Sequence, residues 1–474
     1  MSVLIRNASI GFTGRRGDVL VDGDRVVAVE PVGLPANGAE VVDAQGGTLL
    51  PGLVDAHAHL LQWASSRRRV SLADAASAVA AAELIAAAAD PDGLVQGANF
   101  HAALWPDKPD KSLLDRVLPD RPVALFSNDL HTLWLSSAAM RLVGVDHPTG
   151  VFIEGECMAL TAALPTPSTD VTDGWVVAAT EAAAARGVTA IADYEYTDTV
   201  RDWQRRATPA TRIRCVIAKF LLDETVERGL RTGAAVGDRL TVGPLKIFMD
   251  GSLNTRTAYC HHHYPGSDYD GELLEPLDGL LPVLRKAVTA GIGLALHAIG
   301  DRANTMALDA FAELGVGGRI EHAQLLDLAD VPRFAELGVV AGIQPAHQPD
   351  DRDAADKHWA GRTGRAFAYR ALHEAGATLE LGSDAPVAPL DPWDAIASAV
   401  TRTDDERPGW HQEQALPLDA AVAASTGGRG TTVEVGAPAD LALAGRDLTE
   451  LAPGELRDLP INATLLGGRF THRA

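Results

Sequence analysis

The chain has 474 residues, 46% of them hydrophobic, and carries a formal net charge of −22 at pH 7. That length and apolar content are enough for a large buried core, while the negative charge argues against nucleic-acid binding, because phosphate contacts require a basic surface. The three cysteines are not closely spaced, so the sequence indicates neither a disulfide framework nor a cysteine-rich zinc site. It shows no signal peptide and no apolar run long enough to span a membrane, so we expect a cytoplasmic protein without a membrane partner.

The predicted elements begin with a strand-rich segment. Residues 1–50 read as short alternating strands with turns at 22–24 and 46–47, and residues 426–474 at the other end have the same style. We interpret these two segments as parts of one small β-sandwich domain. Residues 51–425 between them are predicted to form the larger domain.

In the larger domain, strand-like apolar runs alternate with alanine-rich helical stretches, a pattern typical of a parallel sheet. The eight expected strands are 48–54, 122–126, 188–193, 240–248, 292–296, 318–321, 338–343 and 378–382. The expected helices include 176–186, 280–290, 303–314 and 366–375. The predicted fold class is therefore α/β, a (β/α)8 TIM-like barrel. The long segment at about 60–175 indicates an insertion over the mouth of the barrel.

Side chains with metal-binding chemistry lie at or near the C-terminal ends of these strands. The first strand runs into His57 and His59, whose i, i+2 spacing places both side chains on one face. Later strands deliver, in chain order, Lys246, His297, His322 and Asp384. Each of these has an ordinary explanation by itself, as a core histidine, a helix cap or an ion pair. Together they are expected to converge, because the C-terminal ends of parallel barrel strands meet at one mouth.

With these residues the chain resembles the amidohydrolase superfamily of metal-dependent hydrolases. More narrowly, it is similar to the amidohydrolase-3 group of YtcJ-like and N-substituted formamide deformylase-like proteins, in the segments 250–253, 256–258, 297–301, 321–324, 382–386 and 436–441, and in Pro122-Val123, His131 and Trp134. The chain departs from the group's pattern in loops that would line the pocket. It has Leu130-His131, Ser136-Ser137 and Asn254 where Gly-His, Asn-Ser and Gly are expected.

The expected ligand set is His57, His59, Lys246, His297, His322 and Asp384. Neutral imidazoles and a carboxylate suit zinc, as one ion or two, with iron or manganese as alternatives. Such a site lowers the pKa of bound water to about 7 and polarises a carbonyl. Asp384 is expected to be both ligand and catalytic proton shuttle. Lys246 is either carboxylated and bridges two ions, or an unmodified pocket residue beside one ion.

The predicted function is metal-dependent hydrolysis of a C–N bond in an amide, N-formyl or cyclic amide small molecule. Arg256, His131 and Trp134 are expected to contact the substrate, although Arg256 is as consistent with a salt bridge that anchors its loop. The alternatives are a deaminase of a nitrogen heterocycle and a catalytically silent scaffold protein. The presence of all six candidate ligands argues against the latter. A homodimer is a further expectation.

Overall fold

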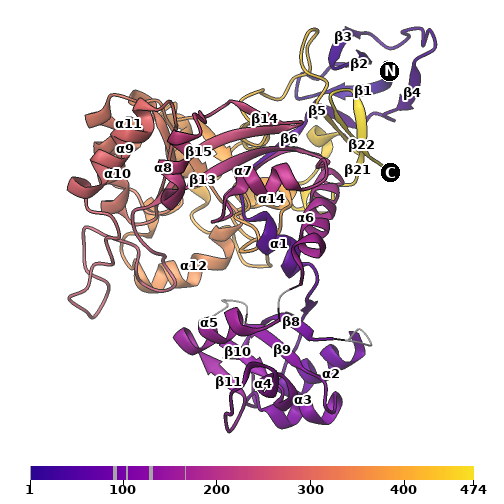
Figure 1. Ribbon diagram of the computed structural model, residues 1–474. Helices are drawn as coiled ribbons and strands as arrows, with labels where there is room; N and C mark the ends of the chain where they lie inside the picture. The colour runs from indigo at the N-terminus through magenta and orange to yellow at the C-terminus, as the bar shows by residue number, and fades with distance from the viewer. Residues whose placement is uncertain (1, 89–92, 103–104, 128–131, 166) are drawn as a thin grey trace. The chain divides into compact units, whose positions relative to one another are not determined.

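The computed structural model describes residues 2–88, 93–102, 105–127, 132–165 and 167–474. The chain divides into two compact units, one of Met1–Leu60 with Val177–Ala474 and one of Leu61–Val176 (Figure 1). Within the described ranges, no helix has both the length and the apolar character needed to cross a membrane.

The first unit contains a nearly closed barrel of eight parallel strands in the order β19-β18-β17-β16-β15-β13-β12-β6. Their bounds are β6 (Leu53–Ala58), β12 (Val188–Asp193), β13 (Arg212–Ala218), β15 (Leu240–Phe248), β16 (Leu294–Ala298), β17 (Gly318–His322), β18 (Val339–Ile343) and β19 (Leu379–Leu381). A short antiparallel strand, β14 (Ala235–Gly237), pairs with β15. The barrel expected from the sequence is therefore confirmed.

Helices alternate with the barrel strands along the chain. They are α6 (Thr169–Ala184), α7 (Thr199–Arg205), α8 (Leu222–Glu227), α9 (Leu277–Thr289), α10 (Asp301–Leu314), α11 (Val331–Glu336), α12 (His347–His358), α13 (Tyr369–Glu374), α14 (Pro392–Thr401) and α15 (Leu418–Ala424). In α9 and α10, Leu280, Leu284 and Phe311 are fully buried in the main core. Each such side chain stabilises the fold by roughly 1.5–3 kcal/mol relative to exposure. Gly315 ends α10 in the left-handed region at φ 63°.

Both termini contribute to one strand-rich domain, also as expected. Its strands are β1 (Ser2–Ile10), β2 (Arg16–Asp22), β3 (Arg25–Glu30), β4 (Glu40–Asp43), β5 (Thr48–Pro51), β20 (Leu441–Ala444), β21 (Ile461–Leu466) and β22 (Arg469–Arg473). They form one mostly antiparallel sheet in the order β22-β21-β20-β5-β1-β2-β3, with β4 on β1. Alternate residues of its strands build a separate apolar core that includes Val3, Ile5, Val19 and Leu441.

The second unit has its own five-stranded sheet in the order β11-β10-β9-β8-β7. Its elements are β7 (Val70–Ser71), β8 (Val95–Phe100), β9 (Val123–Ser127), β10 (Thr132–Leu135), β11 (Val151–Ile153), α1 (Leu60–Ser66), α2 (Ala78–Ala88), α3 (Lys111–Val117), α4 (Ser137–Val143) and α5 (Glu154–Ala163). A core of its own includes Phe100, Leu125 and Trp134.

Two strand predictions were wrong in detail. The run 122–126, expected in the barrel, is β9 of the second unit, and the third barrel strand is β13 instead. The sequence pattern missed β13 because Arg212 and Arg214 interrupt its apolar run. The expected strand 48–54 is two strands in two sheets, β5 and β6, which part at Gly52. A Cβ at Gly52 would lie 2.1 Å from Thr189, so close packing requires glycine there.

Candidate metal centre

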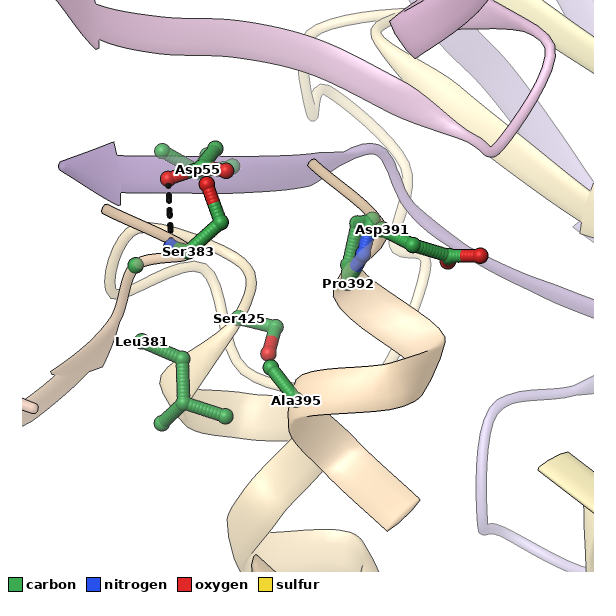
Figure 2. A pocket seen from close by; sticks show the side chains of 9 residues that line it. Asp55, Leu381, Ser383, Asp391, Pro392, Ala395 and Ser425 are labelled. Atoms are coloured by element: carbon green, nitrogen blue, oxygen red, sulfur yellow. Dashed lines mark hydrogen bonds between the residues drawn. The ribbon is translucent and has the colours of Figure 1, made fainter. Parts of the chain in front are cut away.

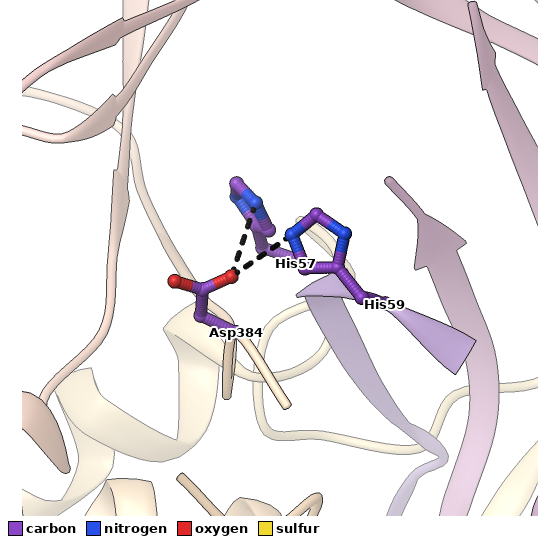
Figure 3. A group of neighbouring side chains, drawn as sticks. All are labelled: His57, His59 and Asp384. Atoms are coloured by element: carbon purple, nitrogen blue, oxygen red, sulfur yellow. Dashed lines mark ion pairs between the residues drawn. The ribbon is translucent and has the colours of Figure 1, made fainter. Parts of the chain in front are cut away.

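The seam of the barrel brings two histidines and an aspartate together. His57 and His59 leave the end of β6, and Asp384 follows β19. Oδ1 of Asp384 lies 3.5 Å from Nε2 of His57 and 3.2 Å from Nε2 of His59 (Figure 3). The expected convergence of these three side chains is therefore present in the structure.

Asp384 also lies close to a second pair of histidines. His322 ends β17, His347 begins α12, and Nε2 of His347 lies 4.0 Å from Oδ2 of Asp384. In each group of three, His57–His59–Asp384 and His322–His347–Asp384, one ligand atom per residue lies within 4.8 Å of the others. Asp384 is thus common to two groups, each with the residue types that bind a divalent cation.

Two of these residues have unusual backbone conformations. Asp384 has φ 54° and His322 has φ 76°, in the left-handed region that residues with a Cβ seldom adopt. Such conformations cost of order 1–3 kcal/mol and persist where the surrounding structure imposes them, often at functional sites. The strained backbone aims both side chains at the same point of the barrel mouth.

His297 and Lys246 lie beside these groups rather than in them. The His297 ring is 4.4 Å from the His322 ring, and its Nε2 lies 3.1 Å from the carbonyl oxygen of Gly251. Lys246 is 2% exposed, and its Nζ lies 4.9 Å from the ring centres of both Tyr194 and Phe248. Lys246 takes part in none of the ion pairs formed within the described residues.

The buried imidazoles fit a bound cation. Four of their nitrogens have no hydrogen-bond partner among the described residues: His59 Nδ1, His297 Nδ1, His322 Nδ1 and His347 Nε2. An unsatisfied buried polar atom costs about 1–3 kcal/mol, so such a cluster calls for a ligand. Burial lowers the pKa of His57 to about 4 and of His297 to about 3. These rings are therefore neutral at pH 7, which is the form that binds metals.

The pKa values of Asp384 and His59 shift in opposite directions, because each residue stabilises the charged form of the other. Burial by itself would raise the pKa of Asp384, but the neighbouring His57 and the hydrogen bond with His59 hold it well below its usual value. Burial likewise opposes protonation of His59, yet Asp384 outweighs it and raises the pKa of His59. A cation binds the neutral form of His59, so cation binding competes with protonation of this ring.

A buried hydrogen-bond network holds His57 in place. Nδ1 of His57 donates to Oε2 of Glu321 at 2.9 Å, which leaves Nε2 to face Asp384. Tyr194 stacks on the His57 ring at 3.8 Å and donates its hydroxyl to Oε1 of Glu321 at 2.7 Å. Arg319 donates to the same oxygen at 2.7 Å and balances the charge of Glu321. Such partners fix the tautomer and orientation of a metal-binding histidine.

Asp55 joins the two strands of the seam behind this network. Its Oδ1 accepts the backbone N–H of Ser383 at 3.0 Å (Figure 2). It also accepts the backbone N–H of His57, at 3.1 Å. Burial raises the pKa of Asp55 to about 6. A cavity of about 10 Å³ beside it, lined also by Ser425 and Asp391, is just large enough for one water molecule.

His347 was not among the ligands predicted from the sequence. It lies four residues beyond the seventh predicted strand, 338–343. The other candidate ligands likewise lie at or near the C-terminal ends of predicted strands. That position was a usable signal. The role of Glu321 beside His57 had no such signal, because it depends on a contact between residues 264 positions apart.

Two of the residues expected to contact the substrate, Trp134 and His131, gain no support from the described structure. Trp134 is fully buried in the core of the second unit, 6.3 Å from Phe100 and 6.5 Å from Trp105, which contradicts direct contact with a substrate. The cause is its place on the inward face of β10, where a large aromatic ring fills the core. His131 lies outside the described residues.

Arg256 is exposed on the loop that follows β15. It forms no salt bridge with any described residue, so the structure gives no support to its expected alternative role as a loop anchor. Asp250 anchors that loop instead. Its carboxylate accepts backbone N–H groups of Tyr259, Ile299 and Gly300 at 2.8–3.0 Å, and burial raises its pKa to about 7.

Several known proteins are similar to this chain in sequence. The chain is 27% identical over 479 residues to Protein LONG AFTER FAR-RED 3 of Arabidopsis thaliana, covering 91% of this chain and 80% of that protein. It is 28% identical to the putative amidohydrolase YtcJ of Bacillus subtilis, with 91% and 90% covered, and 26% identical to the N-substituted formamide deformylase of Arthrobacter pascens, with 98% and 97% covered.

The fold is shared with solved structures. An uncharacterised metal-dependent hydrolase from Pyrococcus horikoshii matches with a TM-score of 0.82 and 23% identity, over 96% of this chain and 99% of that one. A family model described as the amidohydrolase family matches residues 40–472. The chain therefore belongs to the amidohydrolase family and is a hydrolase that acts on carbon–nitrogen bonds.

Proposed function

We propose that this protein hydrolyses a C–N bond of an amide, N-formyl or cyclic amide small molecule in a reaction that depends on a divalent metal. The observation that carries the proposal is the position of Asp384, whose carboxylate is common to two groups of three potential ligands, one with His57 and His59 and one with His322 and His347. Family membership supplies the reaction class. The unpaired imidazole nitrogens support a working site over a catalytically silent scaffold.

The residues that would hold the metal are His57, His59, His297, His322 and Asp384, with His347 added by the structure and Lys246 if it is modified. When bound, zinc, or iron or manganese in its place, supplies Lewis-acid chemistry by lowering the pKa of water and polarising the carbonyl of the substrate. We propose one or two such ions.

Asp384 is the proposed proton shuttle. Its carboxylate is ionised at neutral pH, because its pKa lies well below the usual value. It accepts a proton from the attacking water as the oxygen bonds to the carbonyl carbon. It then delivers that proton to the leaving nitrogen as the C–N bond breaks. The products are a carboxylic acid, or formate from an N-formyl substrate, and an amine. A cyclic amide gives one ring-opened molecule that carries both groups.

Lys246 is proposed to be carboxylated. Burial lowers its pKa to about 8, so a larger fraction of the amine is neutral and able to add to carbon dioxide at pH 7 to 8. The protonated amine first loses one proton, and the neutral amine then forms an N–C bond with carbon dioxide and loses a second, so a cation becomes an anion, as a metal bridge requires. An unmodified Lys246 would instead stay as a cation between the rings of Tyr194 and Phe248.

The test combines metal analysis with a substrate screen. The zinc-loaded protein would be offered N-formyl, N-acetyl and cyclic amides, with amine and carboxylic acid both measured, beside the Asp384→Asn variant. We expect both products from at least one class, with little turnover by the variant. Release of ammonia from a nitrogen heterocycle, without a carboxylic acid, would replace the proposal with the deaminase alternative. No turnover of any class by the fully loaded protein would support the silent scaffold.

A further inference from the structure

Three aromatic side chains form a row at the C-terminal ends of neighbouring barrel strands. Tyr196 lies just after β12, Phe220 just after β13, and Phe248 at the end of β15. The ring of Tyr196 is 5.1 Å from that of Phe220 and 6.0 Å from that of Phe248. The Phe248 ring is in turn 5.2 Å from the ring of His297. We call Tyr196, Phe220 and Phe248 the aromatic row.

The outer part of the aromatic row is open. Phe220 is 60% exposed and Tyr196 is 48% exposed, whereas most large aromatic side chains of this chain are buried. The ring of Tyr196 meets the other two edge to face, at 67° and 68°, rather than stacked face to face. Exposed aromatic side chains gathered at one place stabilise the fold little and are typical of binding sites.

We propose that the aromatic row binds an aromatic or bulky apolar substituent of the amide substrate. The proposal rests on the proposed function and names the class of substrate that the same site takes. The row is continuous with His297 at one end, so a substituent on it would hold the scissile amide against the candidate metal centre. Three rings are far smaller than the roughly 800 Å² per partner of a stable protein interface, which favours a small molecule as the occupant.

The probes are two hydroxamates that bind a metal through the same group, acetohydroxamate and phenylacetohydroxamate. Their affinities would be measured for the zinc-loaded wild type, Phe220→Ala and a control, Val435→Ala, which removes an equally exposed apolar side chain from the loop before β20. We expect the wild type to prefer the phenyl compound about tenfold. Phe220→Ala should lose most of that preference with unchanged affinity for acetohydroxamate, and Val435→Ala should keep it.

An unchanged preference in Phe220→Ala would overturn the aromatic row as a subsite, and so would failure of phenylacetohydroxamate to bind the wild type. Because 60% of the Phe220 side chain is exposed, its truncation should leave folding intact, which thermal unfolding would check.

Hydroxamate binding needs no turnover. If the hydroxamates behave as expected but no amide is hydrolysed, the proposed function fails while the subsite stands. If amides with methyl and phenyl substituents are hydrolysed equally well by wild type and variant, the subsite fails while the function stands.

Discussion

The backbone N–H of Asp384 donates to the carbonyl oxygen of His57 at 2.6 Å, and the carboxylate of the same aspartate lies 3.5 Å from Nε2 of the same histidine. The first contact joins the segment after β19 to β6 across the seam of the nearly closed barrel, and the second belongs to the candidate metal centre. A Cβ at Gly382 would lie 2.7 Å from the backbone nitrogen of His57, so the close approach requires glycine. Barrel closure and assembly of the site therefore depend on the same few atoms.

Asp384→Asn should separate metal binding from proton transfer. Asparagine keeps the size and one ligand oxygen but cannot accept the proton, so turnover should fall by roughly 10²- to 10⁴-fold, or further because ligation is also weaker. Metal content would be measured beside the rate, with the exposed Asp405→Asn as control. Near-wild-type turnover by Asp384→Asn would show that the shuttle is elsewhere. Joint loss of metal and fold would assign Asp384 a structural role.

Glu321→Gln should weaken metal binding through His57. The substitution keeps the shape but removes the charge that receives the Nδ1 proton, and loss of such a partner typically costs 10- to 100-fold in metal affinity. A competition titration with a coloured chelator measures this without turnover. Gly342→Ala gives an independent check, because its Cβ would lie 2.3 Å from Oε2 of Glu321. Wild-type affinity in both variants would contradict a role of Glu321 in positioning His57.

His347→Ala should lower metal affinity or stoichiometry, since it removes one of the three residues of the second group. His358→Ala is the matched control, because His358 ends the same helix, α12, and belongs to neither group. Metal content after dialysis against a weak chelator would be compared for the two variants. Equal metal content in both would exclude His347 as a ligand.

Lys246 should make stability depend on pH in metal-free, carbon dioxide-free buffer. Its pKa is about 8 in the fold and 10.5 in an exposed lysine, so the unfolded chain binds more protons between these values and stability rises with pH. Relative to Lys246→Met, the wild type should gain about 3 kcal/mol between pH 8 and pH 10.5. Urea unfolding of both proteins at each pH measures the difference, in which the other titrating groups cancel. A constant difference would mean that Lys246 does not titrate there, as expected of a carboxylated side chain.

Much of the fold was predictable because local patterns repeat along the chain. Alternating apolar strands and helical stretches predicted the barrel, and the i, i+2 spacing of His57 and His59 predicted a shared face. The proximity of Asp384, His297 and His322 was predictable because parallel strands bring their C-terminal ends to one mouth.

The sequence by itself determined the residue types of the site and the class of fold, since both follow from short-range spacing. Only the tertiary structure decided which sheet each strand joins. The apolar pattern of 122–126 does not specify its sheet, and two arginines interrupt the apolar pattern of β13. The tertiary structure also decided that Trp134 is a core residue, that Glu321 holds His57, and that His347 faces Asp384. These outcomes depend on contacts between distant parts of the chain, whose geometry no local spacing specifies.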